Sequence, residues 1–496
     1  MCEMCEGRPH HAEIAAGQGI LAAPADVGGG AAAAKGKSAT AMPADAGKAG
    51  RKVLIRGGAV MSMDPAVGDF DEADVLVEGD KIAAVGRKLD AGDAAIIDAA
   101  GMIVMPGFID PHHHQFETAL RGFLADGILI NDGQPHGVFN YYEYILLKLA
   151  MVYRPQDVYT NVLFGSLAQL DAGVTSVMDV SQIHHSPEHS DAVVKALSDA
   201  GRRSVFGYFE GWGDNTKYPG DATRMKKQYF SSDDQLLSMV MGGEIYIPGY
   251  ENAWKTGREL SIPIALHVVG TFGMAPTMDQ LAQTGQIGPD NIFIHMTGMT
   301  DLAWKTAADA GARLTFSVPI EMHMRHGWPP IQKALSLGMQ PSLSSDVECT
   351  MTSDPFTQMR AALTLQRGFV NDAALAGGTE LPELLTSRDV IRFATVEGAK
   401  CLGLEKKTGT LTPGKDADII LLDATAINVT PLNHVPGAVA TLMERSNVDT
   451  VMIAGKIRKW RGELIGVDIP KLRRELEASR DYIFEAAKVE KNLFRA

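Results

Sequence analysis

The nine residues PGFIDPHHH, at positions 106–114, decide the fold class of this chain. An apolar segment, residues 103–109, has the pattern of a β-strand, and three consecutive histidines follow its end. Side chains at positions i and i+2 of an extended segment point to the same side, so His112 and His114 can reach one ion. His113 then points the other way. The pattern predicts a strand whose C-terminal end carries metal-binding imidazoles.

Short apolar segments alternate with helix-like segments from about residue 107 to residue 402. This alternation is typical of a parallel α/β barrel of the TIM (β/α)8 type. The active site of such a barrel lies at the C-terminal ends of its strands. The eight strands that we predict are residues 103–109, 175–179, 204–208, 238–241, 263–267, 292–295, 313–318 and 341–344.

Three further strand ends carry side chains that can bind a metal ion. His267 and His295 each end an apolar strand, and Asp346 follows residues 341–344. A single histidine at such a position is more often an ordinary core residue, but four strand ends of this kind together indicate a site. Imidazole and carboxylate ligands suit Zn²⁺, with Fe²⁺ or Mn²⁺ as alternatives. Asp346 can accept a proton from metal-activated water, and His295 can polarise the substrate.

Short β segments at both ends of the chain predict a small second domain. Residues 53–55, 74–78 and 82–85 alternate or cluster apolar residues between turns, and residues 419–422 and 451–453 do so near the other end. We expect four parts: a loosely attached tail (1–50), a β-sandwich domain (51–105 plus 405–466), the metal-binding barrel (106–404) and a C-terminal helix (467–496).

Composition restricts the partners of the protein. The formal net charge of −14 over 496 residues argues against nucleic acid or an anionic membrane surface as the main partner. No apolar run reaches the roughly 18 residues of a membrane span. Four cysteines are too few for a disulfide framework, so we expect a cytoplasmic protein. A degenerate export signal in the Ala- and Gly-rich tail is the alternative. The tail residues Cys2, Cys5, His10 and His11 either bind a metal or are incidental.

The chain resembles the amidohydrolase superfamily over about residues 51–466. The matching features are PGFIDPHHH, the strand-end His267 and His295, SSD (344–346) and GAKCLG (398–403). Two further segments, ETALRG (117–122) and DPFTQMR (354–360), are similar to the branch that contains cytosine deaminases and triazine chlorohydrolases.

This resemblance implies a distorted barrel with a β-sandwich and a homodimer or larger homo-oligomer. It also implies a single divalent ion, since residues 238–243 contain no lysine that could bridge two ions. The implied ligands are His112, His114, His267 and Asp346.

One position departs from the pattern of that branch. The branch usually carries H-x-x-E after the fifth strand, where the glutamate moves protons to the leaving nitrogen, but here the segment is HVVG and ends at Gly270. Glu321 or His323, near the predicted mouth, could instead act as general acid; the alternative is a polar loop without a catalytic role. The residues that we expect to contact the substrate are Gln115, His184, His185 and Trp328.

The predicted function is hydrolysis of a C–N bond in a small, cyclic compound, either an amide or an amine-substituted ring. Dehalogenation or a non-hydrolytic elimination at the same metal is the alternative, because Gly270 has no side chain to protonate an amine. A scaffold without activity is a third possibility, which the complete ligand set disfavours.

Overall fold

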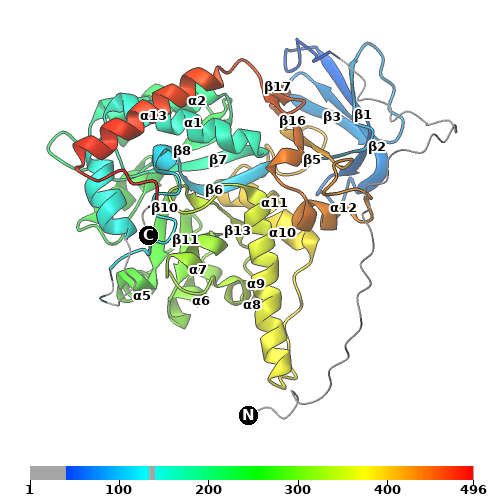
Figure 1. Cartoon of the computed structure of the whole chain (residues 1–496). Helices are drawn as coiled ribbons and strands as arrows, with labels where there is room; N and C mark the ends of the chain where they lie inside the picture. Colours follow the sequence, from blue (N-terminus) through cyan, green and yellow to red (C-terminus); the bar gives the residue numbers. More distant parts are fainter. Residues whose placement is uncertain (1–40, 132, 134–139, 495–496) are drawn as a thin grey trace, which may run out of the picture. The chain divides into compact units, whose positions relative to one another are not determined.

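The computed structural model describes residues 41–131, 133 and 140–494, and Thr40–Ala496 form one compact unit (Figure 1). The tail cysteines and histidines considered above lie outside the described residues. The predicted tail boundary at residue 50 falls inside the described part, where Met42 and Ala46 pack against an apolar cluster of the N-terminal strands.

A curled parallel sheet carries the predicted strand ends. In the described part of the chain its order is β13-β12-β11-β10-β9-β8-β7-β6-β14, and all of its neighbouring strands are parallel. Its strands are β6 (Phe108–His114), β7 (Val174–Ser181), β8 (Arg203–Tyr208), β9 (Leu237–Gly242), β10 (Ile264–Val269), β11 (Asn291–Thr297), β12 (Arg313–Phe316), β13 (Ser342–Leu343) and β14 (Asp346–Val347).

The last strand is split between the two edges of this sheet. Ser342 in β13 pairs with Thr315 in β12, whereas Asp346 in β14 pairs with His113 in β6. Because β13 and β14 are only a few residues apart, the first and last strands are drawn together. The result is a mixed α/β fold with a curled, TIM-like parallel sheet, as the alternation of strands and helices predicted.

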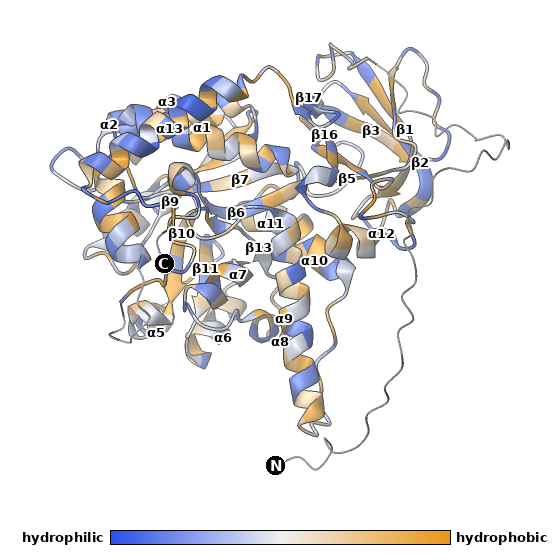
Figure 2. Ribbon diagram, viewed as in Figure 1, coloured by the Kyte–Doolittle hydropathy of each residue, from blue (hydrophilic) through white to orange (hydrophobic). Residues whose placement is uncertain are grey.

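Helices cover the outside of the curled sheet. Several begin at a proline in the first turn, where the missing N–H costs nothing. They are α1 (Pro155–Asp171), α2 (Pro187–Ala200), α3 (Ala222–Tyr229), α4 (Tyr250–Glu259), α5 (Ala275–Gln283), α6 (Asp301–Asp309), α7 (Val318–His323), α8 (Ile331–Ser336), α9 (Pro355–Leu375), α10 (Ser387–Phe393) and α11 (Val396–Leu402). Apolar residues concentrate on the strands, while α3 is largely hydrophilic (Figure 2).

Short helical turns fill several loops. A π-helix, η2 (Tyr142–Leu149), and two 3₁₀ turns, η1 (Gln115–Leu120) and η4 (Gly270–Phe272), lie close to the strand ends that carry the predicted site. The remaining short elements are η3 (Ala150–Val152), α12 (Val435–Gly437), η5 (Ala438–Leu442) and η6 (Arg445–Asn447).

A second, mostly antiparallel sheet combines both ends of the chain (Figure 1). Its central contact is β5 against β15, where Pro106 pairs with Ile419, so segments more than 300 residues apart share one ladder. Its strands are β1 (Lys52–Met61), β2 (Asp69–Glu78), β3 (Lys81–Gly86), β4 (Ala95–Asp98), β5 (Met102–Pro106), β15 (Ile419–Asp423), β16 (Val448–Ile453), β17 (Lys456–Trp460) and β18 (Glu463–Leu464).

The predicted strand over residues 103–109 is in fact two strands. Residues up to Pro106 belong to β5 of the second sheet, and β6 of the curled sheet begins at Phe108. Gly107 joins them where a Cβ atom would lie 2.1 Å from the Thr175 side chain. An unbroken apolar run conceals this change of sheet, because both strands are buried.

The C-terminal helix α13 (Ile469–Ala486) begins where Asp468 caps it, with its carboxylate accepting from the Lys471 N–H at 3.0 Å. It packs on α1, where the Arg154 guanidinium lies 3.4 Å from the centre of the Tyr482 ring. Among the helices that the structure describes, none has the length and apolar character that a membrane span requires.

Candidate metal centre

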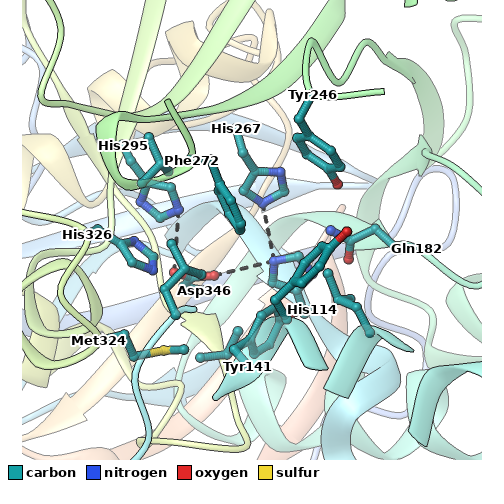
Figure 3. A pocket seen from close by; sticks show the side chains of 15 residues that line it. His114, Tyr141, Gln182, Tyr246, His267, Phe272, His295, Met324, His326 and Asp346 are labelled. Atoms are coloured by element: carbon teal, nitrogen blue, oxygen red, sulfur yellow. Dashed lines mark hydrogen bonds and ion pairs between the residues drawn. The ribbon is translucent and has the colours of Figure 1, made fainter. Parts of the chain in front are cut away.

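The four ligands expected from the sequence lie close together on β6, β10 and β14, and three short contacts link them. The Nε2 atoms of His112 and His114 lie 2.9 and 3.3 Å from Asp346 Oδ1. The Nε2 atom of His267 lies 3.4 Å from that of His114 (Figure 3). His113 points away, as predicted, and its Nδ1 atom faces the Asp346 carbonyl oxygen at 3.0 Å.

These side chains fit a single divalent ion. Two ligand atoms at about 2.0–2.1 Å from a tetrahedral Zn²⁺ are about 3.3 Å apart, which is close to the separation of the two facing Nε2 atoms. Asp346 Oδ2 is buried and has no hydrogen-bond partner among the described residues. Imidazole nitrogens that face one another around a buried carboxylate oxygen form a donor set that a divalent ion satisfies.

The protonation states of His112 and Asp346 suit metal binding. Burial holds the pKa of His112 well below its ordinary value, although Asp346 partly offsets this effect. Burial raises the pKa of Asp346, but attraction to His112 and His295 outweighs it and holds that pKa well below its usual range. A neutral imidazole and an ionised carboxylate are the forms that bind metal ions.

Backbone strain accompanies two of these positions. Asp346 has φ +63° and His295 has φ +74°, both in the left-handed region that non-glycine residues seldom adopt. Each costs on the order of 1–3 kcal/mol, and such residues cluster at active sites.

Buried carboxylates hold two of the histidine rings from behind. Glu244, just after β9, accepts from His267 Nδ1 at 2.6 Å, and Glu321 accepts from His295 Nδ1 at 3.0 Å. Such partners fix the ring so that Nε2 faces the centre. The sequence analysis missed Glu244, although an acid directly after the fourth strand was a signal for it.

A pocket opens above the metal centre. Its walls are largely apolar, and Tyr246 stacks against Phe272 at 5.8 Å between ring centroids (Figure 3). The space between the side chains measures about 30 Å³, enough for about one or two waters. The described residues that line it are His114, Leu129, Tyr141, Tyr142, Leu146, Gln182, Tyr246, His267, Val269, Phe272, His295, Met324, His326, Asp346 and Val347.

Tyr142, Tyr246 and Phe272 are the half-buried aromatic side chains of this lining, and the rings of Tyr142 and Phe272 meet edge to face at 5.8 Å. A ring-sized substrate therefore enters only when such lining side chains move apart.

Two pocket residues that the sequence analysis missed carry unpartnered polar atoms. Gln182 Oε1 and both ring nitrogens of His326 are buried without a hydrogen-bond partner in the described part of the chain. Burial, reinforced by the neighbouring His295, lowers the pKa of His326 to about 3, so its ring is neutral. Gln182 directly follows β7, whereas His326 follows β12 only after α7, and nothing in the local sequence distinguishes either from other loop residues.

The two residues predicted as general acids lie away from the cavity. Glu321 is buried behind His295, and its Oε1 atom also accepts from the Ser317 N–H at 2.9 Å. His323 is exposed, with Nε2 at 2.5 Å from the Ala125 carbonyl oxygen. Neither is among the described residues that line the pocket. The sequence-based prediction placed both residues at the mouth because it did not include helix α7. In the structure this helix directs His323 outward and sets Glu321 behind His295.

The residues predicted to contact the substrate are also placed elsewhere. Trp328 is 68% exposed and packs edge to face against Phe369. Gln115 donates to Asp179 at 2.9 Å, and His184 and His185 bond to the carbonyl oxygens of Gly207 and Ala150. None of the four appears among the lining residues that the structure describes. They follow strand ends, but local turns direct their side chains into the packed interior or out to solvent.

Gly270 occupies a space that no side chain can fill. A Cβ atom there would lie 2.9 Å from Gly298 Cα and 3.2 Å from the Thr297 carbonyl oxygen. The packing of the loops that follow β10 and β11 therefore leaves no room for a carboxylate side chain at this position.

The sequence profile of the Amidohydrolase family matches residues 103–228 and 279–458, which is more than half of the chain. The chain therefore belongs to the amidohydrolase family. It is an enzyme, a metal-dependent hydrolase of non-peptide carbon–nitrogen bonds.

Two curated relatives match nearly end to end. A 5'-deoxyadenosine deaminase of Methanosarcina barkeri is 25% identical over 452 residues, which cover 86% of this chain and 98% of the relative. A 5-methylthioadenosine/S-adenosylhomocysteine deaminase of Pyrococcus abyssi is 26% identical over 439 residues, which cover 85% and 96%.

Two solved structures share the fold. An adenosine deaminase from Xanthomonas campestris with bound zinc has a TM-score of 0.76 and 22% identity, and the match covers 88% of this chain and all of that one. Atrazine chlorohydrolase TrzN from Arthrobacter aurescens, complexed with zinc, has a TM-score of 0.75 and 20% identity, and the match covers 86% and all of that chain.

Proposed function

We propose that this enzyme hydrolytically removes an amino group from a small, planar heterocycle, using one divalent ion bound by His112, His114, His267 and Asp346. The observation that carries the proposal is the series of three contacts of 2.9–3.4 Å that links these four side chains beside a pocket with aromatic walls. Zinc is the proposed ion, with Fe²⁺ or Mn²⁺ as alternatives, because it suits mixed imidazole and carboxylate ligands. The zinc named in the structures with this fold supports the choice.

The residues divide the work of hydrolysis between them. When bound, a divalent ion lowers the pKa of a coordinated water to about 7. Asp346 accepts a proton from the attacking water and passes it to the departing nitrogen. A C–O bond forms, the C–N bond breaks and ammonia leaves. The role that we propose for His295, with Nε2 at 3.6 Å from Asp346 Oδ2, is to polarise the ring atom that gains charge. Because Nδ1 donates to Glu321, this role requires a proton on Nε2 as well.

The pocket supports a flat substrate that carries N–H groups. The stacked Tyr246 and Phe272 rings offer faces to a heteroaromatic ring. Gln182 Oε1 is a buried acceptor that a ring N–H or amino group would satisfy. The deaminases named among the relatives act on adenosine derivatives, which contain an amine-substituted ring and thus belong to the proposed substrate class.

A second candidate reaction is displacement of a halide, or elimination, at the same centre. Gly270 favours it, because the packing against Gly298 excludes the carboxylate that would protonate an amine. A chlorohydrolase among the structures with this fold is in keeping with this candidate.

We also propose that the curled sheet is a distorted (β/α)8 barrel, closed through the split strand β13–β14. The second sheet folds into a β-sandwich domain. The enzyme works in the cytoplasm as a homo-oligomer. The ladders from β13 to β12 and from β14 to β6 support the barrel. Sedimentation velocity would test the oligomer, since a purely monomeric species would contradict it.

The deciding experiment measures metal content and product release together. Purified protein is assayed for bound metal and then incubated with amino-substituted purines, pyrimidines and triazines and with their chloro analogues. We expect about one ion per chain and ammonia from at least one amino substrate. Chloride release without ammonia would support the second candidate, and absence of both products would defeat the proposal.

A further inference from the structure

His326 is the polar pocket residue that the roles proposed above leave unused. It is 5% exposed, yet neither ring nitrogen has a hydrogen-bond partner among the described residues. A buried polar atom without a partner costs about 1–3 kcal/mol, and a neutral imidazole has one donor and one acceptor to satisfy. A molecule in the cavity must therefore supply the partner.

The ring of His326 lies beside the reacting groups. It meets the His295 ring edge to face at 4.7 Å, and ligand atoms of His295, His326 and Asp346 lie within 4.8 Å of one another. Gln182 and Tyr246 lie on the opposite side of the pocket (Figure 3). A flat substrate ring with one edge at Gln182 would thus have its opposite edge near His326. The carbon that is attacked would lie above Asp346, close to that opposite edge.

Backbone hydrogen bonds hold His326 in this place. Its N–H donates to the Glu321 carbonyl oxygen at 3.0 Å, and Thr271 Oγ1 donates to the Arg325 carbonyl oxygen at 2.9 Å. The turn that carries His326 is therefore tied both to α7 and to the residue after Gly270. Fixed side chains of this kind lose little entropy when they bind a substrate.

Two neighbouring polar atoms on this side already have partners. His295 Nδ1 is bonded to Glu321, and Asp346 Oδ1 faces His112 and His114. The packing of Gly270 on Gly298 excludes a further side chain there. On this side, His326 is a described residue that lines the pocket with both ring nitrogens without a partner.

We propose that His326 is a catalytic residue whose unprotonated ring nitrogen accepts a hydrogen bond from an N–H of the amino group displaced from the substrate ring. The proposal rests on the proposed function and narrows the substrate class to rings whose leaving nitrogen faces His326. Asp346 still transfers the proton of the water to the lone pair of that nitrogen, and the group departs as ammonia with the electron pair of the broken C–N bond. His326 gains and loses no proton, and it stabilises the protonated nitrogen through this hydrogen bond as the C–N bond breaks.

The test compares His326→Leu and His326→Gln with the matched control His323→Gln, a histidine of the same segment that is exposed. Each variant is assayed on two substrates that differ only in an amino or chloro group at the attacked carbon. We expect His326→Leu to lower kcat/KM for the amino substrate roughly 100-fold, and for the chloro substrate by less than about tenfold, since a chloro group has no N–H from which His326 could accept a hydrogen bond. His326→Gln should recover part of the loss, and the control should match the wild type.

Three results would overturn the proposal. Equal losses on the two substrates would indicate a general structural role, and unchanged kinetics would indicate none. A loss of bound zinc in His326→Leu would make His326 a metal ligand instead.

A second measurement does not depend on turnover. In protein labelled with ¹⁵N-histidine and loaded with zinc, the His326 ring resonances are identified by their loss in His326→Leu. Adding 2,4-diaminopyrimidine should shift them. If the wild type releases no ammonia from any substrate, the proposed function fails, yet a shift still supports His326 as the contact of an amino-heterocycle. Absence of a shift overturns the role of His326, whether or not ammonia is released.

Discussion

The metal centre and the pocket wall above it differ in whether their polar atoms have partners within the described chain. At the centre, three contacts of 2.9–3.4 Å link polar atoms of His112, His114, His267 and Asp346. On the wall, Gln182 and His326 line the cavity and have polar atoms without a partner in the described chain. The first arrangement suits a small cation, and the second suits a molecule with its own hydrogen-bonding groups. The centre thus defines the reaction, and the wall defines which substrate undergoes it.

The largest expected effect comes from the residue that joins both regions. Asp346→Asn should lower kcat at least roughly 1,000-fold, because the amide cannot accept the proton of the water. The fold should persist, since asparagine also tolerates the left-handed conformation of position 346. Ammonia release and circular dichroism measure the two outcomes. Retained activity with normal metal content would show that another group is the base.

Glu244→Gln tests whether the carboxylate that holds the ring of His267 contributes to the affinity for the metal. Glu244 accepts from His267 Nδ1 at 2.6 Å, and loss of such a partner weakens metal binding about 10–100-fold. Competition with a chelator measures the zinc affinity. Glu251→Gln, in an exposed position on α4, is the control and should bind zinc like the wild type. Equal affinity in Glu244→Gln and the control would contradict the role.

Gly270→Ala tests the close packing of Gly270 against Gly298, which leaves no room for a side chain at position 270. The added Cβ would lie 2.9 Å from Gly298 Cα, so the free energy of unfolding should fall by about 2 kcal/mol. Chemical denaturation measures this change. Gly368→Ala is the matched control, because a Cβ there meets no described atom within 4 Å and alanine favours the interior of α9. The control should be neutral or slightly more stable, and equal stability of both variants would disprove the close contact.

Acid should lower the free energy of unfolding through His184, which lies near Gln182 in the sequence. Burial lowers the pKa of the nearby His184 to about 3, whereas an unfolded histidine titrates near 6.5. Below pH 6.5 the unfolded chain binds the extra proton, so stability falls as the pH drops towards 3. This one residue should cost about 1 kcal/mol at pH 5.5. Denaturation of metal-free protein at pH 7.5 and 5.5 measures it, and His184→Asn should show a smaller difference. An unchanged difference would contradict the assignment.

The smallest effect is expected outside both regions. Trp328 is largely exposed and packs only against Phe369 among the ring contacts described. Trp328→Ala should change the free energy of unfolding by no more than about 0.5 kcal/mol and turnover less than about twofold. A large rise in KM would restore Trp328 as a substrate contact.

The sequence by itself predicted the curled parallel sheet and the residues that lie together at the candidate metal centre. Apolar strands that alternate with helices predict the sheet, and His112 and His114 share a side because successive strand residues alternate. His267, His295 and Asp346 were found in the same way, since the C-terminal ends of parallel strands meet at one edge. These are regularities of local pattern, which a reader can see without coordinates.

Only the tertiary structure decided which groups support the centre and which face the substrate. Glu244 bonds His267 across 23 residues, and Glu321 bonds His295 across 26, so neither pairing follows from local periodicity. Helix α7 set Glu321 behind His295, and the loop after it turned Trp328 outward and left His326 beside the cavity. The physical reason is that a strand fixes the direction of its own side chains, whereas the direction of a loop side chain depends on packing against distant parts of the chain.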